Sequence, residues 1–389
     1  MADFIFRTTP WLEIGAGRVS RLGGMVADLA ARSVLLVVDP GVRALGLTAE
    51  AERALADAGL AAQIWDGVAP DPTEPAVLAA VAAAGAARAD AVVGLGGGSA
   101  MDTAKMVALL AGSGARPADC YGVDRAPGRR LPLVLVPTTA GSGSEVTPIA
   151  VVRVPGTAAV AEKTGVVAPQ LLPDAAILDA TLTVTLPASV TAASGIDAMS
   201  HAIEAYNSAG KNPLSDMLAV RALAMLRTGL PRAVAVPDDL TAREAMLVGS
   251  ALAGMASANA PVGAGHALSY PLGQRHGIAH GHAIAAILAP MMAFNRADPG
   301  AEAAFADLAP ALCPSVEGQA PTARVDALID AFAALGPDLG LETRLSALGV
   351  EQAGLDALAA DAQRQRRLLA NNPRPVSHDE ARALYEAAW

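Results

Sequence analysis

The sequence is poor in cysteine, aromatic residues and charge, and each shortage excludes a class of protein. Its 389 residues include two cysteines, Cys120 and Cys313, too few for a disulfide framework, which favours a reducing compartment. Aromatic residues make up 3% of the chain, so small aliphatic side chains must fill most of the core. Charged residues make up 17% and hydrophobic residues 53%, a balance that excludes intrinsic disorder.

Two further shortages concern partners and location. The chain has 28 Lys and Arg against 38 Asp and Glu, and the net charge of −10 argues against sequence-independent binding to nucleic acid. The longest apolar stretch, 283–294, contains Pro290 and is shorter than the ~20 residues that cross a bilayer. The first ten residues lack the basic and apolar segments of a signal peptide. We therefore expect a cytoplasmic protein with no membrane and no nucleic-acid partner.

The length and the pattern of apolar runs predict two domains. The first part alternates β-branched runs with Ala-rich segments, which predicts βαβ units and a mostly parallel sheet, with strands at 33–38, 61–65, 91–95 and 131–136. From residue 187 onward, segments rich in Ala, Leu and Met predict helices at 188–207, 213–228, 241–256, 282–295, 322–335 and 378–388. We expect an α/β domain over residues 1–186 and an all-helical domain over residues 187–389.

Two loops and one acid follow predicted strands, at the sheet edge where α/β proteins bind ligands. The loop that contains Gly96, Gly97, Gly98 and Ser99 leads from a strand into a helix, and its N–H groups favour a phosphate. A tight Gly-rich turn is the alternative. The loop 137–147 carries hydroxyls that suit a phosphate or ribose, or simply a polar surface. Asp39 ends the first strand, where an acid commonly binds the adenosine ribose, although a plain Asp-Pro-Gly turn is the alternative.

The candidate metal site combines one carboxylate with several imidazoles. Asp197 and His201 lie four residues apart in a predicted helix, so both project from one face. His266 and His280 follow, in a chain with only six histidines. This donor set suits a divalent first-row metal such as Fe²⁺ or Zn²⁺. Two further histidines in the same stretch are expected to be bystanders, His276 and His282.

Five motifs, in this order, resemble the iron-containing (group III) alcohol dehydrogenase family. They are GGGSAMD at 96–102, PTTAGSGSEVT at 137–147, GIDAMSHAIEAY at 195–206, HALSYPLG at 266–273 and AHG at 279–281. The resemblance runs almost from end to end, from the turn at 15–17 to the segment 371–374. It implies an N-terminal α/β nucleotide-binding domain, a C-terminal all-α metal-binding domain and a deep cleft between them.

The resemblance also implies the cofactors and the site residues. The family's metal ligands match Asp197, His201, His266 and His280, with Fe²⁺ expected and Zn²⁺ as the alternative. Residues that match the family's NAD site are Asp39, Gly96, Gly97, Gly98, Ser99, Asp102, Thr138, Thr139, Ser142 and Lys163, of which Asp39 matches the position that favours NAD over NADP. The implied reaction is hydride transfer between NAD and a small alcohol or aldehyde, in a homodimer or a higher homo-oligomer.

The sequence departs from the family pattern at Tyr270, where many relatives have a histidine that is often assigned to proton relay. The ordinary pKa of a phenol, near 10, does not suit proton exchange at neutral pH. We interpret Tyr270 as a wall of the substrate pocket. The catalytic alternative is that its hydroxyl orients the substrate or passes the proton. On the same fold, the alternative enzymes are a maleylacetate-reductase-like enzyme, which can act without metal, and a dehydroquinate-synthase-like lyase.

Overall fold

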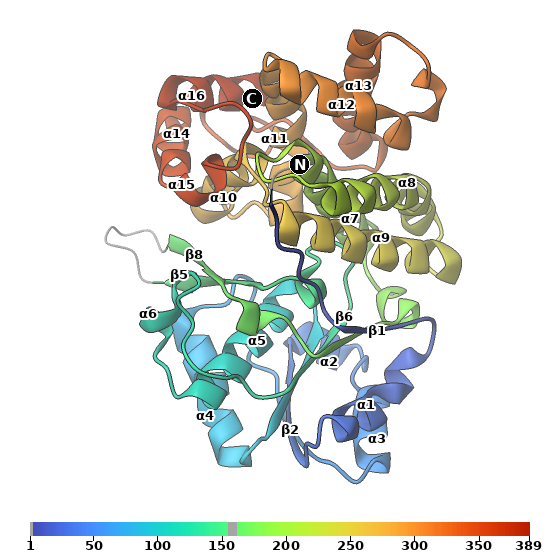
Figure 1. Ribbon diagram of the computed structural model, residues 1–389, viewed down its shortest axis with the longest axis vertical. Coiled ribbons are helices and arrows are strands. Elements are labelled where there is room, and N and C mark those ends of the chain that lie inside the picture. The colour runs from blue at the N-terminus through green and yellow to red at the C-terminus, as the bar shows by residue number, and fades with distance from the viewer. Residues whose placement is uncertain (1–2, 155–161) are drawn as a thin grey trace. The chain divides into compact units, whose positions relative to one another are not determined.

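The computed structural model describes residues 3–154 and 162–389 and divides into two compact units (Figure 1). The sheet unit comprises Arg7–Thr185 and Asp238–Leu247. The helical unit comprises Met1–Phe6, Leu186–Pro237 and Val248–Trp389. The first is an α/β structure and the second is all-helical, so the predicted fold class is confirmed.

The sheet unit is built on a six-stranded parallel sheet in the order β1-β9-β6-β4-β2-β3. Its strands are β1 (Trp11–Ile14), β2 (Ser33–Val38), β3 (Ala61–Trp65), β4 (Ala91–Gly96), β6 (Leu133–Pro137) and β9 (Ala175–Leu178). The four predicted strands correspond to β2, β3, β4 and β6, and the predicted parallel pairing is confirmed. A second sheet, which the sequence analysis missed, has the order β5-β8-β7 and consists of β5 (Gly122–Val123), β7 (Ile149–Val154) and β8 (Glu162–Val167).

Helices cover both faces of the large sheet. Along β2, Val34 and Leu36 share a core with α1 (Leu22–Asp28) and α3 (Ala49–Asp57). Leu35 and Val37 point to the other face and share a core with α4 (Glu74–Ala87) and α5 (Gly98–Ser113). Figure 1 shows the two helix pairs on opposite sides of the strands. Burial on both faces explains why β2 is apolar from Val34 to Val38.

The loops after β2 and β4 diverge. β2 has β3 on one side and β4 on the other. The chain after β2 passes through α2 (Pro40–Ala44) to α3 on one face, whereas the chain after β4 enters α5 on the opposite face. The crevice between two such diverging loops is where doubly wound sheets bind ligands.

The helical unit contains long, mostly buried helices. Its helices, with α9 shared between the units, are α7 (Ala188–Asn207), α8 (Pro213–Ala235), α9 (Leu240–Asn259), α10 (Ala264–His276), α11 (His280–Asn295), α12 (Pro299–Leu312), α13 (Pro321–Asp338), α14 (Leu355–Gln363), α15 (Arg366–Leu369) and α16 (His378–Ala387). The expected helix 188–207 is α7 to the residue, whereas α11 begins two residues earlier than expected, at His280. Helix α10 was not among the helices predicted from the sequence, because Gly265, Pro271 and Gly273 weaken its helical pattern.

Among the described residues, no single helix is both long enough and apolar enough to cross a bilayer. Within residues 3–154 and 162–389, α9 and α10 meet those two measures only when taken together, and a bend of 108° separates them.

Candidate active site

The four predicted metal ligands come from three helices of the helical unit. Asp197 and His201 lie one turn apart on α7, His266 lies in the first turn of α10, and His280 is the first residue of α11. The next residue, Gly281, lets α11 begin against the backbone of α7, because a Cβ at this position would lie 2.2 Å from the carbonyl oxygen of Ala193. No larger residue fits there without moving one of the two helices.

The donor atoms of the four residues converge. Asp197, His201 and His266 each offer one ligand atom, and these atoms all lie within 4.8 Å of one another. His201 Nε2 and His266 Nε2 are 3.1 Å apart, and Asp197 Oδ1 lies 3.8 Å from His266 Nε2. His280 Nε2 lies 3.4 Å from the same Asp197 oxygen. The structure therefore brings together the four residues that the sequence analysis selected.

The donor set fits a divalent metal. His266 is 3% exposed, and its Nδ1 contacts Glu204 Oε2. Because a carboxylate only accepts hydrogen bonds, the His266 Nδ1 donates to Glu204, and Nε2 is the ring nitrogen on the side of His201 and Asp197. Burial disfavours the charged ring, but Glu204 and Asp197 outweigh that effect and raise the pKa of His266. Three imidazole nitrogens and one carboxylate oxygen are a donor set that Fe²⁺ and Zn²⁺ both accept.

Tyr270 and the two histidines predicted to be bystanders, His276 and His282, differ in their surroundings. The Tyr270 ring stands edge-on to His280, with ring centroids 5.6 Å apart. His276 ends α10 and is exposed. His282 Nε2 contacts the carbonyl oxygen of Glu342. Of these three residues, Tyr270 is the one in contact with a predicted metal ligand. Its role in the reaction stays a prediction.

In the sheet unit, the predicted nucleotide-site residues meet at the carboxyl edge of the sheet. Gly96 ends β4 with a φ of +155°, and a Cβ there would lie 3.1 Å from Asp39 Oδ2. A Cβ at Gly97 would lie 3.5 Å from Thr139 Oγ1, and one at Gly98 would lie 3.1 Å from Ser142 Oγ. The glycine loop, the hydroxyl loop and Asp39 therefore lie side by side, in the crevice between the diverging loops.

In the described part of the chain, no side chain caps the start of α5. Gly97 is the N-cap residue of α5, which begins at Gly98. The free N–H groups and the helix dipole favour an anion at this position. Asp39 instead caps its own helix, since its Oδ1 accepts a hydrogen bond of 2.8 Å from the Val42 N–H. Its Oδ2 lies beside Gly96, the last residue of β4.

Lys163 and Ser99 meet at a neighbouring acid. Lys163 Nζ forms an ion pair of 2.8 Å with Asp71 Oδ1, and Ser99 Oγ accepts a hydrogen bond of 3.3 Å from the Asp71 N–H. Asp71 has a positive φ of 52°, a conformation that aspartate tolerates in turns. The segment that contains Asp71 thus joins two of the predicted cofactor contacts.

A buried charged cluster that the sequence analysis missed lies beneath the hydroxyl loop. The Asp102 carboxylate accepts hydrogen bonds from Ser144 Oγ at 2.6 Å and from the Val151 N–H at 2.9 Å. Lys105, one turn further along α5, is fully buried, and burial lowers its pKa to about 8 against the opposing effects of Asp102 and Glu145. Burial likewise raises the pKa of Glu145 to about 7. The Asp102–Lys105 spacing on α5 was the available signal, since i, i+3 pairs share a helix face.

Comparison with known proteins decides the family. The family model described as iron-containing alcohol dehydrogenase matches residues 10–180, and the model for the C-terminal part of the Fe-containing alcohol dehydrogenase family matches residues 191–389. The chain belongs to the iron-containing alcohol dehydrogenase family. The resemblance that the motifs predicted is confirmed, and the maleylacetate-reductase-like and dehydroquinate-synthase-like alternatives are not favoured.

Relatives of this alcohol dehydrogenase match it over nearly their whole length. Long-chain-alcohol dehydrogenase 1 of Geobacillus thermodenitrificans is 38% identical over 383 residues, which cover 98% of this chain and 95% of the relative. The NAD-dependent methanol dehydrogenase of Bacillus methanolicus is 34% identical over 357 residues, 92% of each chain. A crystal structure of a 1,3-propanediol oxidoreductase superposes with a TM-score of 0.95, at 31% identity and with 100% of both chains covered.

Proposed function

We propose that this alcohol dehydrogenase transfers hydride between NAD and a small alcohol or aldehyde, with a divalent metal in the helical unit. The observation that carries the proposal is the convergence of Asp197, His201, His266 and His280 on one point. This donor set, in which Asp197 and His266 are buried, suits the chemistry that names the family. The relatives act on alcohols of different length, so the size of the substrate is left to experiment.

The helical unit would bind the metal and the reacting oxygen. A divalent cation held by three imidazoles and one carboxylate is a Lewis acid that eases loss of the alcohol proton or polarises an aldehyde carbonyl. Glu204 contacts the Nδ1 of His266, which leaves Nε2 as the ring nitrogen that would bind the metal. Tyr270, with its ring edge-on to His280, would form a wall of the substrate pocket. This wall would exclude water and orient the reacting carbon without exchanging a proton.

The sheet unit would bind NAD, which supplies the hydride acceptor. The N–H groups at the start of α5, together with Gly97, Gly98 and Ser99, would hold the pyrophosphate. Asp39 would accept hydrogen bonds from the adenosine ribose and repel a 2′-phosphate, which favours NAD over NADP. Further contacts are assigned to residues of the hydroxyl loop and its surroundings, namely Gly96, Asp102, Thr138, Thr139, Ser142 and Lys163.

Four finer assignments complete the proposal. Residues 1–186 form the nucleotide-binding domain and residues 187–389 the metal- and substrate-binding domain. The metal is Fe²⁺, with Zn²⁺ as the second candidate because both accept this donor set. The enzyme works in the cytoplasm, which agrees with its two cysteines, both unpaired. It assembles as a homodimer or a higher homo-oligomer.

Metal analysis joined to a substrate screen tests the proposal. The chain would be purified without oxygen, its metal content determined, and NADH formation followed with alcohols from methanol to long-chain alcohols and with 1,3-propanediol. We expect about one Fe²⁺ or Zn²⁺ per chain and turnover with at least one alcohol. His280→Ala should lose the metal and the turnover together, because a ligand is removed while the nucleotide-site residues are untouched.

The control is His276→Ala, which removes an exposed histidine outside the cluster and should keep both metal and turnover. Full turnover of a metal-free His280→Ala protein would exclude the metal-dependent reaction. Absence of turnover across the whole panel, with both NADH and NADPH and with metal bound, would exclude the proposed activity.

A further inference from the structure

Glu204 is a buried acid beside the candidate metal site, and both of its carboxylate oxygens are in use. It lies on α7, three residues after His201, and is 4% exposed. Oε1 accepts hydrogen bonds from the backbone N–H groups of Gly263 and Gly265, each at 2.9 Å. Oε2 contacts His266 Nδ1. One side chain thus joins α7 both to the backbone at the start of α10 and to a histidine of the metal cluster.

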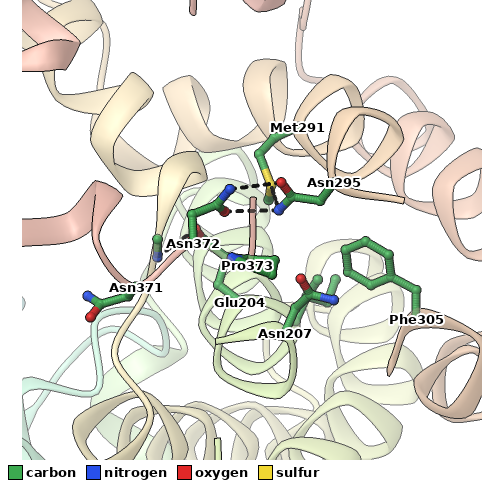
Figure 2. A pocket seen from close by; sticks show the side chains of 10 residues that line it. Glu204, Asn207, Met291, Asn295, Phe305, Asn371, Asn372 and Pro373 are labelled. Atoms are coloured by element: carbon green, nitrogen blue, oxygen red, sulfur yellow. Dashed lines mark hydrogen bonds between the residues drawn. The ribbon is translucent and has the colours of Figure 1, made fainter. Parts of the chain in front are cut away.

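The backbone at the start of α10 is held on its other side by an asparagine pair. Figure 2 shows Asn372 and Asn295, which exchange hydrogen bonds of 2.9 and 2.8 Å and line the same small cavity as Glu204. Asn372 Oδ1 also accepts from the Ala264 N–H at 3.4 Å. Side chains therefore bind three consecutive N–H groups, those of residues 263, 264 and 265. A negative charge at a helix N-terminus is also favoured by the helix dipole.

Two glycines at the start of α10 leave room for the side chains of Glu204 and Asn372. A Cβ at Gly265 would lie 3.0 Å from both the Cδ and the Oε2 of Glu204, and one at Gly263 would lie 3.1 Å from Asn372 Cα. The glycines thus allow the carboxylate to reach the backbone. With Oε1 occupied by two backbone donors, only Oε2 remains for the imidazole of His266.

We propose that Glu204 is the positioning residue of the metal site: it holds His266 as the Nδ1–H tautomer and aims Nε2 at the metal. It acts through His266 and is not itself a ligand, since both of its oxygens are engaged elsewhere. This role rests on the proposed function, because it needs a metal at His266. Contacts of this kind typically change metal affinity by about 10- to 100-fold when they are removed.

Glu204→Gln separates this role from a purely structural one. Glutamine has the same shape but a single acceptor oxygen, and its amide group only donates. The two glycine N–H groups cannot change their roles, so the glutamine oxygen turns to them and its NH₂ group faces His266 Nδ1. The imidazole must then accept at Nδ1 and carry its proton on Nε2, where it blocks metal binding. The matched control is Asn372→Ala, which loosens the start of α10 but leaves the Glu204–His266 contact in place.

Two measurements read the effect without enzyme activity. The first is the affinity of metal-free protein for Zn²⁺, by competition with a chromophoric chelator. We expect Glu204→Gln to bind about 10- to 100-fold more weakly and Asn372→Ala to change by less than about 3-fold. The second is the tautomer of His266 in metal-free protein at alkaline pH, from long-range ¹H–¹⁵N spectra assigned with His266→Ala. We expect Nδ1–H in the wild type and Nε2–H in Glu204→Gln.

The outcomes are separable. Equal Zn²⁺ affinity of Glu204→Gln and wild type, or equal losses in Glu204→Gln and Asn372→Ala, would overturn the positioning role alone. If Glu204→Gln does not fold, the wild-type tautomer decides, and an Nε2–H ring at His266 overturns the proposal. A wild-type chain that takes up no Zn²⁺, or a His266→Ala chain that binds it unchanged, overturns the proposed metal site and this inference with it.

Discussion

Replacing Lys105 by methionine should destabilise the sheet unit by about 3–5 kcal/mol, the range for leaving a buried charge without its counter-charge. Lys105 is fully buried, and its Nζ donates hydrogen bonds to Thr147 O at 2.9 Å, to Thr147 Oγ1 at 3.2 Å and to Ile149 O at 2.7 Å. The cation also offsets the negative charge of Asp102. The substitution therefore removes both a set of donors and a counter-charge.

The contacts themselves give a magnitude of the same size. A hydrogen bond from a charged donor contributes about 1.5–3 kcal/mol, and the two carbonyls of Thr147 and Ile149 each lose one. Methionine matches the length of the lysine stem, so a cavity adds little. Because Asp102 would lose its neighbouring cation, the double variant Lys105→Met with Asp102→Asn should cost less than the sum of the single variants.

Urea unfolding, followed by circular dichroism and by tryptophan fluorescence, measures the loss. The control is Lys211→Met, because Lys211 pairs with Asp216 at 3.1 Å near the surface, with 36% of its side chain exposed. Exposed pairs contribute about 0.2–1 kcal/mol. A loss below about 1 kcal/mol for Lys105→Met, no greater than that of the control, would refute the claim that this buried cation stabilises the fold.

Three further predictions follow from single residues. Asp39→Gly should narrow or reverse the preference for NAD, measured as the ratio of kcat/KM with NADH and NADPH, and a wild type that prefers NADPH would contradict the assignment. Glu145→Gln should gain stability relative to wild type by up to about 3 kcal/mol as pH rises from 4.5 to above 7, because the folded chain keeps a proton on Glu145 that the unfolded chain has lost. If the difference in urea midpoint between Glu145→Gln and wild type is the same at both ends of that pH range, the raised pKa of Glu145 is excluded. Tyr270→Phe should change KM modestly and leave the pH profile unaltered, whereas a kcat loss of about 10²–10⁴ at constant KM would assign the hydroxyl to proton transfer.

The central strands and the ligand residues could be predicted because local pattern and tertiary structure agree there. The apolar run of β2 lies between helices on both faces, so its sequence is uniform and its bounds are sharp. The second sheet was missed because its strands lack such a continuous apolar run. β7 and β8 pair with each other at the side of the unit, and Arg153 and Lys163 interrupt their apolar pattern. A short antiparallel pair with charged positions resembles a loop in sequence.

In helix α10, residues that serve the candidate site lower the helix propensity of the sequence. Its thirteen residues contain Gly265, Pro271 and Gly273, which lower helix propensity and hid the element from the pattern of apolar residues. At Gly265 the structure supplies the reason, since a side chain there would meet Glu204. The residue that weakens the helix in sequence is the one that lets the carboxylate reach its backbone.

Glu204 was missed although the same spacing rule that paired Asp197 with His201 places it on the same face of α7, seven residues after Asp197. Periodicity alone does not tell a buried acid from one that faces solvent, and its partners lie 59 to 62 residues away, on another helix. Two sequence patterns taken together would have identified Glu204 as a buried acid. An acid on the ligand face of one helix, together with glycines one and three residues before a histidine at the start of another, exposes backbone donors that only an acceptor can satisfy. Such a pair of patterns predicts a carboxylate bound to both the helix start and the imidazole.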